Sequence, residues 1–276
     1  MHHVEGQLAG VGGVELYWQG WLPDGSAAGV LLLCHGMGEH SGRYATVVDT
    51  LVPDGWAVYG LDHRGHGRSG GRRVHVRRYA DYLADYETFR RAVVVRHHDV
   101  RPFLLGHSMG GHIALGYALD HQDVLAGLVL SAPALATPAL PRATRSAVML
   151  AARVAPTLRR AVVDLSGISS DETVVAAYRA DALVHHGKPT LGLSVTLLLQ
   201  MERLLGRACE LRLPLLVLHG TADRVCDPAG SRALEGSAGT PDLTVRWYEG
   251  LWHEVFHEPG RERPLADLRD WLDARR

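Results

Sequence analysis

Lysine, cysteine and long apolar runs are scarce in this chain of 276 residues. Lys188 is the only lysine, and 29 Lys and Arg stand against 30 Asp and Glu. This balance gives no reason to expect nucleic acid or an acidic membrane as the main partner. The three scattered cysteines, at 34, 209 and 226, imply no disulfide framework and favour a reducing, cytoplasmic compartment.

Targeting and anchoring segments are also lacking. Residues 1–10 contain no apolar core of a secretory signal, and no stretch of about 18 apolar residues predicts a membrane span. Because 46% of the residues are hydrophobic and 21% are charged, the chain can bury a large core. We therefore expect one soluble domain, with room for an insertion.

One glycine-rich stretch follows an apolar run and precedes a segment of helical composition. Gly106, Ser108 and Gly110 form the G-x-S-x-G pattern of a nucleophile elbow, a sharp strand-to-helix turn that projects a serine hydroxyl from a sheet. Glycines are needed there because a Cβ would clash with the tight backbone. On this motif alone, an ordinary glycine-rich turn remains open.

Apolar runs alternate with helical patterns along most of the chain. The earliest strand, 14–22, is expected to be antiparallel, and the next strands are expected at 30–34, 56–61, 102–105, 124–131, 214–220 and 243–248. Expected helices include 79–97, 228–235 and 263–274. This alternation predicts an α/β protein with a mostly parallel, doubly wound sheet.

The alternation breaks between residues 134 and 205, where two long helical patterns, 143–163 and 191–205, occur without a convincing strand. That is far more than one crossover helix needs. We interpret 134–205 as a helical cap inserted into a core made of 1–133 and 206–276. A larger helical layer without a substrate role, and a membrane-facing cap surface, remain open.

Three polar side chains each follow the end of an expected parallel strand. Ser108, Asp223 and His253 come in the chain order of the α/β-hydrolase triad, at the sheet edge where ligands bind. The second choice for the acid is Asp227, which lies four residues further from its strand. Asp62 ranks low because it precedes the serine.

The chemistry of ester cleavage needs these residue types. A serine hydroxyl is a weak nucleophile near neutral pH, so His253 must take the proton of Ser108. Asp223 must fix the imidazole tautomer and stabilise the imidazolium. These roles predict a serine hydrolase.

The transition state also needs donors for its oxyanion. One is expected from the backbone N–H of Met109 at the start of the helix, and the other from Met37 in the loop after the strand 30–34. Gly36 leaves room for the backbone of that loop to turn.

The segment His253 to His257 reads H-E-x-x-H, the zincin signature. That motif binds zinc only on a helix, where both imidazoles lie on one face. Pro259 and Gly260 leave little room for a helix, and no third ligand is evident, so we expect no metal.

Four motifs resemble the monoacylglycerol lipase family over nearly the whole chain, from about residue 12: HGMGEHSGRY (35–44), DHRGHGRSGG (62–71), GHSMGG (106–111) and HGTADR (219–224). The resemblance is closest to bacterial, actinobacterial-type members. It implies an α/β-hydrolase fold with a helical cap, no cofactor, and cleavage of glycerol monoesters to glycerol and fatty acid.

The resemblance also implies that Glu39, Arg43, His107 and Tyr178 lie at or near the glycerol end of the substrate pocket, with Gly36 beside them. The segment 178–181 departs from the commoner Tyr-Asn-x-Asp-Pro pattern of the family. No role transfers to His257, because its spacing from His253 differs. Cys226 lies where some relatives carry a reactive thiol, and a plain buried cysteine remains an equal alternative.

Three other functions stay open. A lysophospholipase or a general carboxylesterase would use the same triad with a different pocket. A non-catalytic binding protein would share the fold without the chemistry. A carboxylic ester hydrolase acting on monoacylglycerols is the function that the sequence favours.

Overall fold

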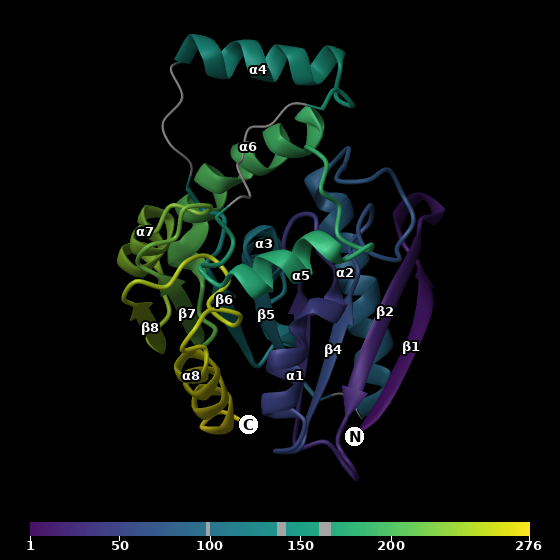
Figure 1. Cartoon of the computed structure of the whole chain (residues 1–276), viewed down its shortest axis with the longest axis vertical. Coiled ribbons are helices and arrows are strands. Elements are labelled where there is room, and N and C mark those ends of the chain that lie inside the picture. The colour runs from purple at the N-terminus through teal and green to yellow at the C-terminus, as the bar shows by residue number, and fades with distance from the viewer. Residues whose placement is uncertain (98–99, 137–141, 160–166) are drawn as a thin grey trace.

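An eight-stranded sheet with helices on both faces forms the centre of the molecule (Figure 1). The computed structural model describes residues 1–97, 100–136, 142–159 and 167–276. The strand order is β1-β2-β4-β3-β5-β6-β7-β8; β2 pairs antiparallel with both β1 and β4, and all other neighbouring strands pair in parallel. The strands are β1 (His2–Ala9), β2 (Glu15–Leu22), β3 (Gly29–Cys34), β4 (Trp56–Leu61), β5 (Phe103–His107), β6 (Gly127–Ser131), β7 (Leu215–Gly220) and β8 (Leu243–Tyr248).

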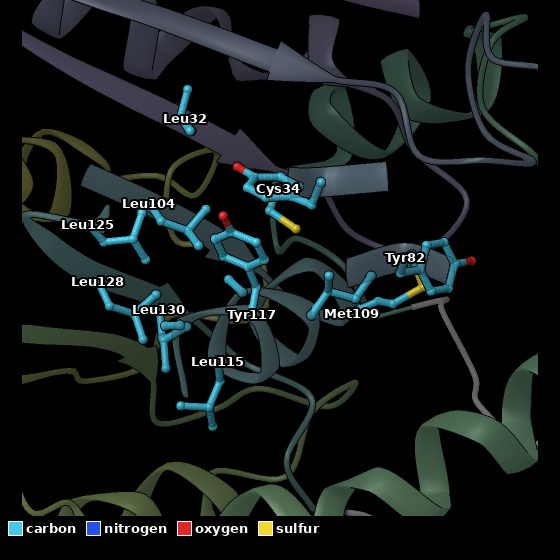
Figure 2. Close-up of a cluster of buried hydrophobic side chains, with 14 of the residues drawn as sticks. Leu32, Cys34, Tyr82, Leu104, Met109, Leu115, Tyr117, Leu125, Leu128 and Leu130 are labelled. Carbon is cyan, nitrogen blue, oxygen red and sulfur yellow. The ribbon is translucent and has the colours of Figure 1, made fainter. Parts of the chain in front are cut away.

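The helices of the described residues are α1 (Ala45–Leu51), α2 (Tyr79–Val94), α3 (Met109–Asp120), α4 (Arg142–Val154), α5 (Glu172–Ala180), α6 (Leu191–Arg207), α7 (Ala229–Ser237) and α8 (Glu262–Asp273). Because strand side chains alternate, Leu31 and Leu33 of β3 pack with residues of α1 and α8 on one face. On the other face, Leu32 and Cys34 pack with α2 and α3 (Figure 2).

The predicted α/β-hydrolase fold with its mostly parallel sheet is confirmed, but several element bounds were wrong. The strand expected at 124–131 begins at Gly127, after a 3-10 turn at Gln122–Val124. The helix expected at 79–97 ends at Val94 and continues as the 3-10 turn Val95–His97. Residues 160–163 of the expected helix 143–163 lie outside the described residues. The edge strand β1 was not predicted.

Between β6 and β7 the chain forms α4, α5 and α6, which we call the cap. The cap lies over the end of the sheet at which the parallel strands finish, with α6 packed between α3 and α4 (Figure 1). Leu193, Leu197 and Leu204 of α6 join the hydrophobic core that surrounds α3. In the described part of the chain, no helix is both long enough and apolar enough to span a bilayer.

Candidate active site

Ser108 occupies a strained turn between β5 and α3. Its φ of 54° and ψ of −121° lie where non-glycine residues are rare. Its N–H donates to the carbonyl of Ser131 over 3.0 Å, which fixes the turn against β6. A Cβ at Gly110 would lie 1.9 Å from the carbonyl oxygen of Cys34, so only glycine fits where α3 meets β3. The turn therefore has the geometry expected of an elbow.

The loop after β3 comes close to Ser108. A Cβ at Gly36 would lie 3.2 Å from the Cβ of Ser108 and 2.7 Å from Oε1 of Glu39, so a larger residue would push the loop away. None of the hydrogen bonds among the described residues uses the N–H of Met37 or of Met109.

Asp223 and His253 form the pair that the sequence predicted. Nδ1 of His253 lies 2.8 Å from Oδ2 of Asp223, and both side chains are buried. Oδ1 of Asp223 accepts the N–H groups of Val225 and Cys226 at 2.7 and 3.0 Å. Because its carboxylate is held on both oxygens, Asp223 fixes the orientation of the imidazole of His253.

The ring of His253 lies over the elbow. Its centroid is 4.6 Å from that of His107, the residue that precedes Ser108. Oγ of Ser108 contacts Sγ of Cys226 at 3.8 Å, and among the described residues no hydrogen bond joins this Oγ to His253. Catalytic hydrogen bonds often tighten only when substrate binds.

The two weaker acid candidates have structural contacts. Oδ1 of Asp227 accepts the N–H of Ala229 over 2.9 Å at the start of α7. Asp62 is buried and accepts the N–H and hydroxyl of Ser41 and the N–H of Arg68, which shapes the loop 62–71.

A buried ionic network lies beside the elbow. The guanidinium of Arg43 bridges Glu39 and Glu254, with one nitrogen 2.7 Å from each and a second nitrogen 2.8 Å from the other oxygen of Glu254. Tyr44 donates its hydroxyl to Glu39 over 2.9 Å. A recess of about 10 Å³, room for about one water, borders this network. It is lined by Glu39, Tyr44, His107, Glu254, Phe256 and His257.

Burial and charge set the protonation of these groups. Burial alone would raise the pKa of Glu39, but the charge of Arg43 outweighs it and holds this pKa at about 2. Glu254 is likewise held well below its ordinary pKa by His257 and Arg43, against the effect of burial. Burial lowers the pKa of His107 to about 4. The recess therefore has ionised carboxylates and a neutral His107 at neutral pH.

The cap contributes to the same region through α5 and the segment that follows it. Tyr178 lies under the guanidinium of Arg43, 4.6 Å from it. Asp181 lies 2.8 Å from Nε2 of His40, and the N–H of His185 donates to the carbonyl of Gly38 over 2.7 Å. The cap thus contacts the loop that carries the Met37 amide.

The H-E-x-x-H segment forms turns between β8 and α8. His253 bonds Asp223, Glu254 pairs with Arg43, and Nε2 of His257 donates to the Arg43 carbonyl over 2.8 Å. Among the described residues, no group of three His, Cys, Asp or Glu side chains has the arrangement of a metal site.

Three residues at this site escaped the sequence analysis. Glu254 was considered only as part of a zinc motif, although it holds Arg43. Asp181 was noted only for its unusual neighbours. His219 was part of a family motif, and its Nε2 lies 3.1 Å from Oδ2 of Asp223. The spacing of four residues between His219 and Asp223 was the only available signal.

We expect Arg43→Gln to lower the free energy of unfolding at pH 7 by about 3–5 kcal/mol, because it removes the guanidinium that the buried carboxylates Glu39 and Glu254 share. The folded-state pKa values of both carboxylates lie below the ordinary 4.5, so the stability they contribute is complete above that pH. It is lost as pH falls toward 2. Urea denaturation from pH 7 to pH 3 should show the variant and the wild type converging in acid.

Arg91→Gln is the matched control, since Arg91 pairs with Glu87 but its side chain is 74% exposed. Its effect should stay within about 0.5 kcal/mol. An equal effect of the two substitutions, or no convergence in acid, would contradict a stabilising buried network.

A mostly parallel sheet with a helical insertion over its carboxyl edge places the molecule in the α/β-hydrolase class. A family model described as "Serine aminopeptidase, S33" matches residues 25–260. A monoacylglycerol lipase of Mycolicibacterium smegmatis is 39% identical over 97% of this chain and 96% of its own length. The chain belongs to this serine hydrolase family, and its resemblance to monoacylglycerol lipases is confirmed.

Two further proteins share this similarity. The monoglyceride lipase of Rattus norvegicus is 32% identical over 97% of this chain and 90% of its own length. The crystal structure of Paleococcus ferrophilus monoacylglycerol lipase superimposes with a TM-score of 0.84 and 31% identity, covering 95% of this chain and 99% of that one.

Proposed function

We propose that this chain hydrolyses monoacylglycerols to glycerol and free fatty acid through an acyl-enzyme formed on Ser108. The observation that carries the proposal is the meeting of the strained serine, the Asp223–His253 pair and the charged recess at one sheet edge beneath the cap. The activities named for the similar proteins support the same conclusion.

In the proposed mechanism, His253 accepts the proton of Ser108 while the hydroxyl attacks the ester carbonyl. The N–H groups of Met37 and Met109 stabilise the oxyanion, and the dipole of α3 adds to this effect. His253 then donates the proton to the leaving glycerol. Water, activated by the same histidine, releases the fatty acid. These steps need no cofactor.

The substrate has a polar glycerol end and an apolar acyl chain, and we place them in different parts of the site. The glycerol hydroxyls bind at the polar end of the substrate site, beside Gly36. The side chains that receive them are Glu39, Arg43, His107 and Tyr178. The cap, with the bounds 134–205 proposed from the sequence, covers the acyl chain. The packing of α6 against α3, the helix that begins directly after Ser108, supports this assignment.

Comparison of rates tests the substrate. We expect the purified protein to cleave monoacylglycerols with a higher kcat/KM than diacylglycerols, lysophosphatidylcholine or short synthetic esters. A clear preference for lysophosphatidylcholine would replace the proposal by a lysophospholipase, and a preference for short esters by a general carboxylesterase. Faster cleavage of aminoacyl anilides would instead favour the peptidase activity named in the family description.

We further propose a cytoplasmic enzyme that contacts a lipid surface through the cap. All three cysteines are free, as in a reducing compartment. Leu150 and Val154 of α4 are 62% and 80% exposed, and Leu158 follows them on the surface. Beside them, a groove of about 280 Å³ between α4 and α6 is lined mainly by apolar side chains and by Arg77 and Arg153. Exposed apolar residues flanked by arginine are typical of interfacial helices.

The double variant Leu150→Glu, Val154→Glu should weaken co-sedimentation with phospholipid vesicles at least about fivefold, because charge replaces the exposed apolar residues. Its kcat/KM on a water-soluble short ester should equal that of the wild type. Val95→Glu is the control, since Val95 is 78% exposed outside the cap. Unchanged sedimentation of the double variant, or an equal loss in the control, would contradict docking through α4.

A further inference from the structure

A second histidine contacts the carboxylate of Asp223. His219, at the end of β7, is buried, and its Nε2 lies 3.1 Å from Oδ2 of Asp223 and 3.3 Å from the carbonyl oxygen of Cys226. Its Nδ1 lies 2.7 Å from Oγ of Ser231 on α7. The same Oδ2 is the acceptor for His253, so two imidazoles meet at one carboxylate oxygen.

The partners of His219 define its tautomer. Nε2 faces only acceptors, a carboxylate and a carbonyl, so this nitrogen carries the proton. Nδ1 then accepts the hydroxyl hydrogen of Ser231. A neutral His219 can therefore donate one hydrogen bond to Asp223, and Ser231 keeps the proton on the nitrogen that makes it.

We propose that His219 is a positioning residue of the catalytic triad, which acts through Asp223 by donating a fourth hydrogen bond to its carboxylate. The proposal rests on the proposed function, since it takes Asp223 as the triad acid. With the amides of Val225 and Cys226 on Oδ1 and the two histidines on Oδ2, the carboxylate has no freedom to rotate away from His253.

The hydrogen bond from His219 also changes the electrostatics of Asp223, because two histidines now share its negatively charged carboxylate. Burial alone would raise the pKa of Asp223, but the hydrogen bonds from His219 and His253 hold it well below its ordinary value. If the hydrogen bond from His219 is removed, the carboxylate of Asp223 attracts a protonated His253 more strongly. We therefore expect the acidic limb of the pH–activity profile to move to higher pH.

Other charged or titratable groups face this cluster and must stay constant in a test. His107 and Glu254 lie on the His253 side, and the thiol of Cys226 lies between Asp223 and Ser108. On the other side, Trp247 of β8 stacks on His219 at 5.8 Å, under the guanidinium of Arg232. A substitution of His219 leaves all of them in place.

The pH profile of kcat/KM for a soluble ester tests the proposal with His219→Leu and His219→Gln. We expect His219→Leu to lower kcat/KM at pH 7 roughly tenfold and to move the acidic limb upward by about 0.5 to 1 pH unit. The kcat/KM of His219→Gln should lie within about threefold of the wild-type value, because its amide can donate to Asp223. Its acidic limb should fall at nearly the same pH as that of the wild type. If His219→Leu does not fold, His219→Asn replaces it, since its shorter amide does not reach Asp223.

Trp247→Leu is the control for packing. It should lower the midpoint of thermal unfolding and leave the acidic limb unchanged. An unshifted limb in His219→Leu, or an equal shift in His219→Gln, would overturn the role of His219. These outcomes are distinct from failure of the proposed function, which would appear as full esterase activity in Ser108→Ala.

Discussion

Ser108→Ala is expected to lower kcat for ester hydrolysis roughly 10⁵- to 10⁶-fold, because it removes the hydroxyl on which the acyl-enzyme is proposed to form. The protein should still fold. Within the described part of the chain, Oγ of Ser108 makes one weak hydrogen-bond contact, to Cys226, and alanine has the same backbone requirements at the strained turn. Initial rates on a monoacylglycerol, together with thermal unfolding of both proteins, provide the measurement.

Cys226→Ala is the matched control for this variant. The Cys226 thiol lies next to Ser108, but burial and the charge of Asp223 raise its pKa well above the ordinary value, so it stays protonated. Cys226→Ala should therefore keep activity within about threefold of the wild type. Activity that survives Ser108→Ala and disappears in Cys226→Ala would mean that the thiol is the nucleophile. If activity survives Ser108→Ala but is lost when a metal chelator is added, the zinc hypothesis would be restored.

Asp223→Asn is expected to lower kcat about 10⁴-fold and to leave a measurable remnant. The carboxylate of Asp223 accepts hydrogen bonds on both oxygens, whereas an asparagine accepts on one side and donates on the other. With the amide nitrogen toward His253, Nδ1 must become the acceptor, so the proton moves to Nε2. In that tautomer His253 cannot take the proton of Ser108.

The control is Asp227→Asn at the second acid considered from the sequence. Among the described residues, the carboxylate of Asp227 accepts a hydrogen bond only from the N–H of Ala229, so its replacement by an amide should change activity by less than about threefold. Steady-state rates of both variants and a folding check by circular dichroism decide the assignment. Near-normal activity in Asp223→Asn, with a large loss in Asp227→Asn, would transfer the role of acid to Asp227.

Most of the sheet could be predicted because its buried strands are continuous apolar runs that end in glycine or polar residues. Residues 30–34, 56–61 and 214–220 are of this kind and form β3, β4 and β7. The edge strand β1 could not be predicted, because its partly buried face carries only two large apolar residues, Val4 and Leu8, with Gly6 between them. Its stability comes from pairing with β2, which depends on the rest of the fold.

The candidate triad could be predicted because each member follows a strand end, and the parallel sheet brings those ends together. The ionic network could not. Arg43 and Glu254 are 211 positions apart, and no local pattern links them. The zinc motif gave Glu254 a misleading context, because turns rather than a helix follow β8. The tautomer of His219 likewise depends on Ser231, which only the packing of α7 brings to it.

The central claim, that Ser108 is the nucleophile of an ester hydrolase, is tested most directly by covalent labelling with a fluorophosphonate followed by peptide mass spectrometry. We expect one adduct per chain, on Ser108, with loss of monoacylglycerol hydrolysis in proportion to labelling and no adduct in Ser108→Ala. Absence of labelling in the wild type, or equal labelling of Ser108→Ala, would contradict the claim and favour a non-catalytic binding protein or a different nucleophile.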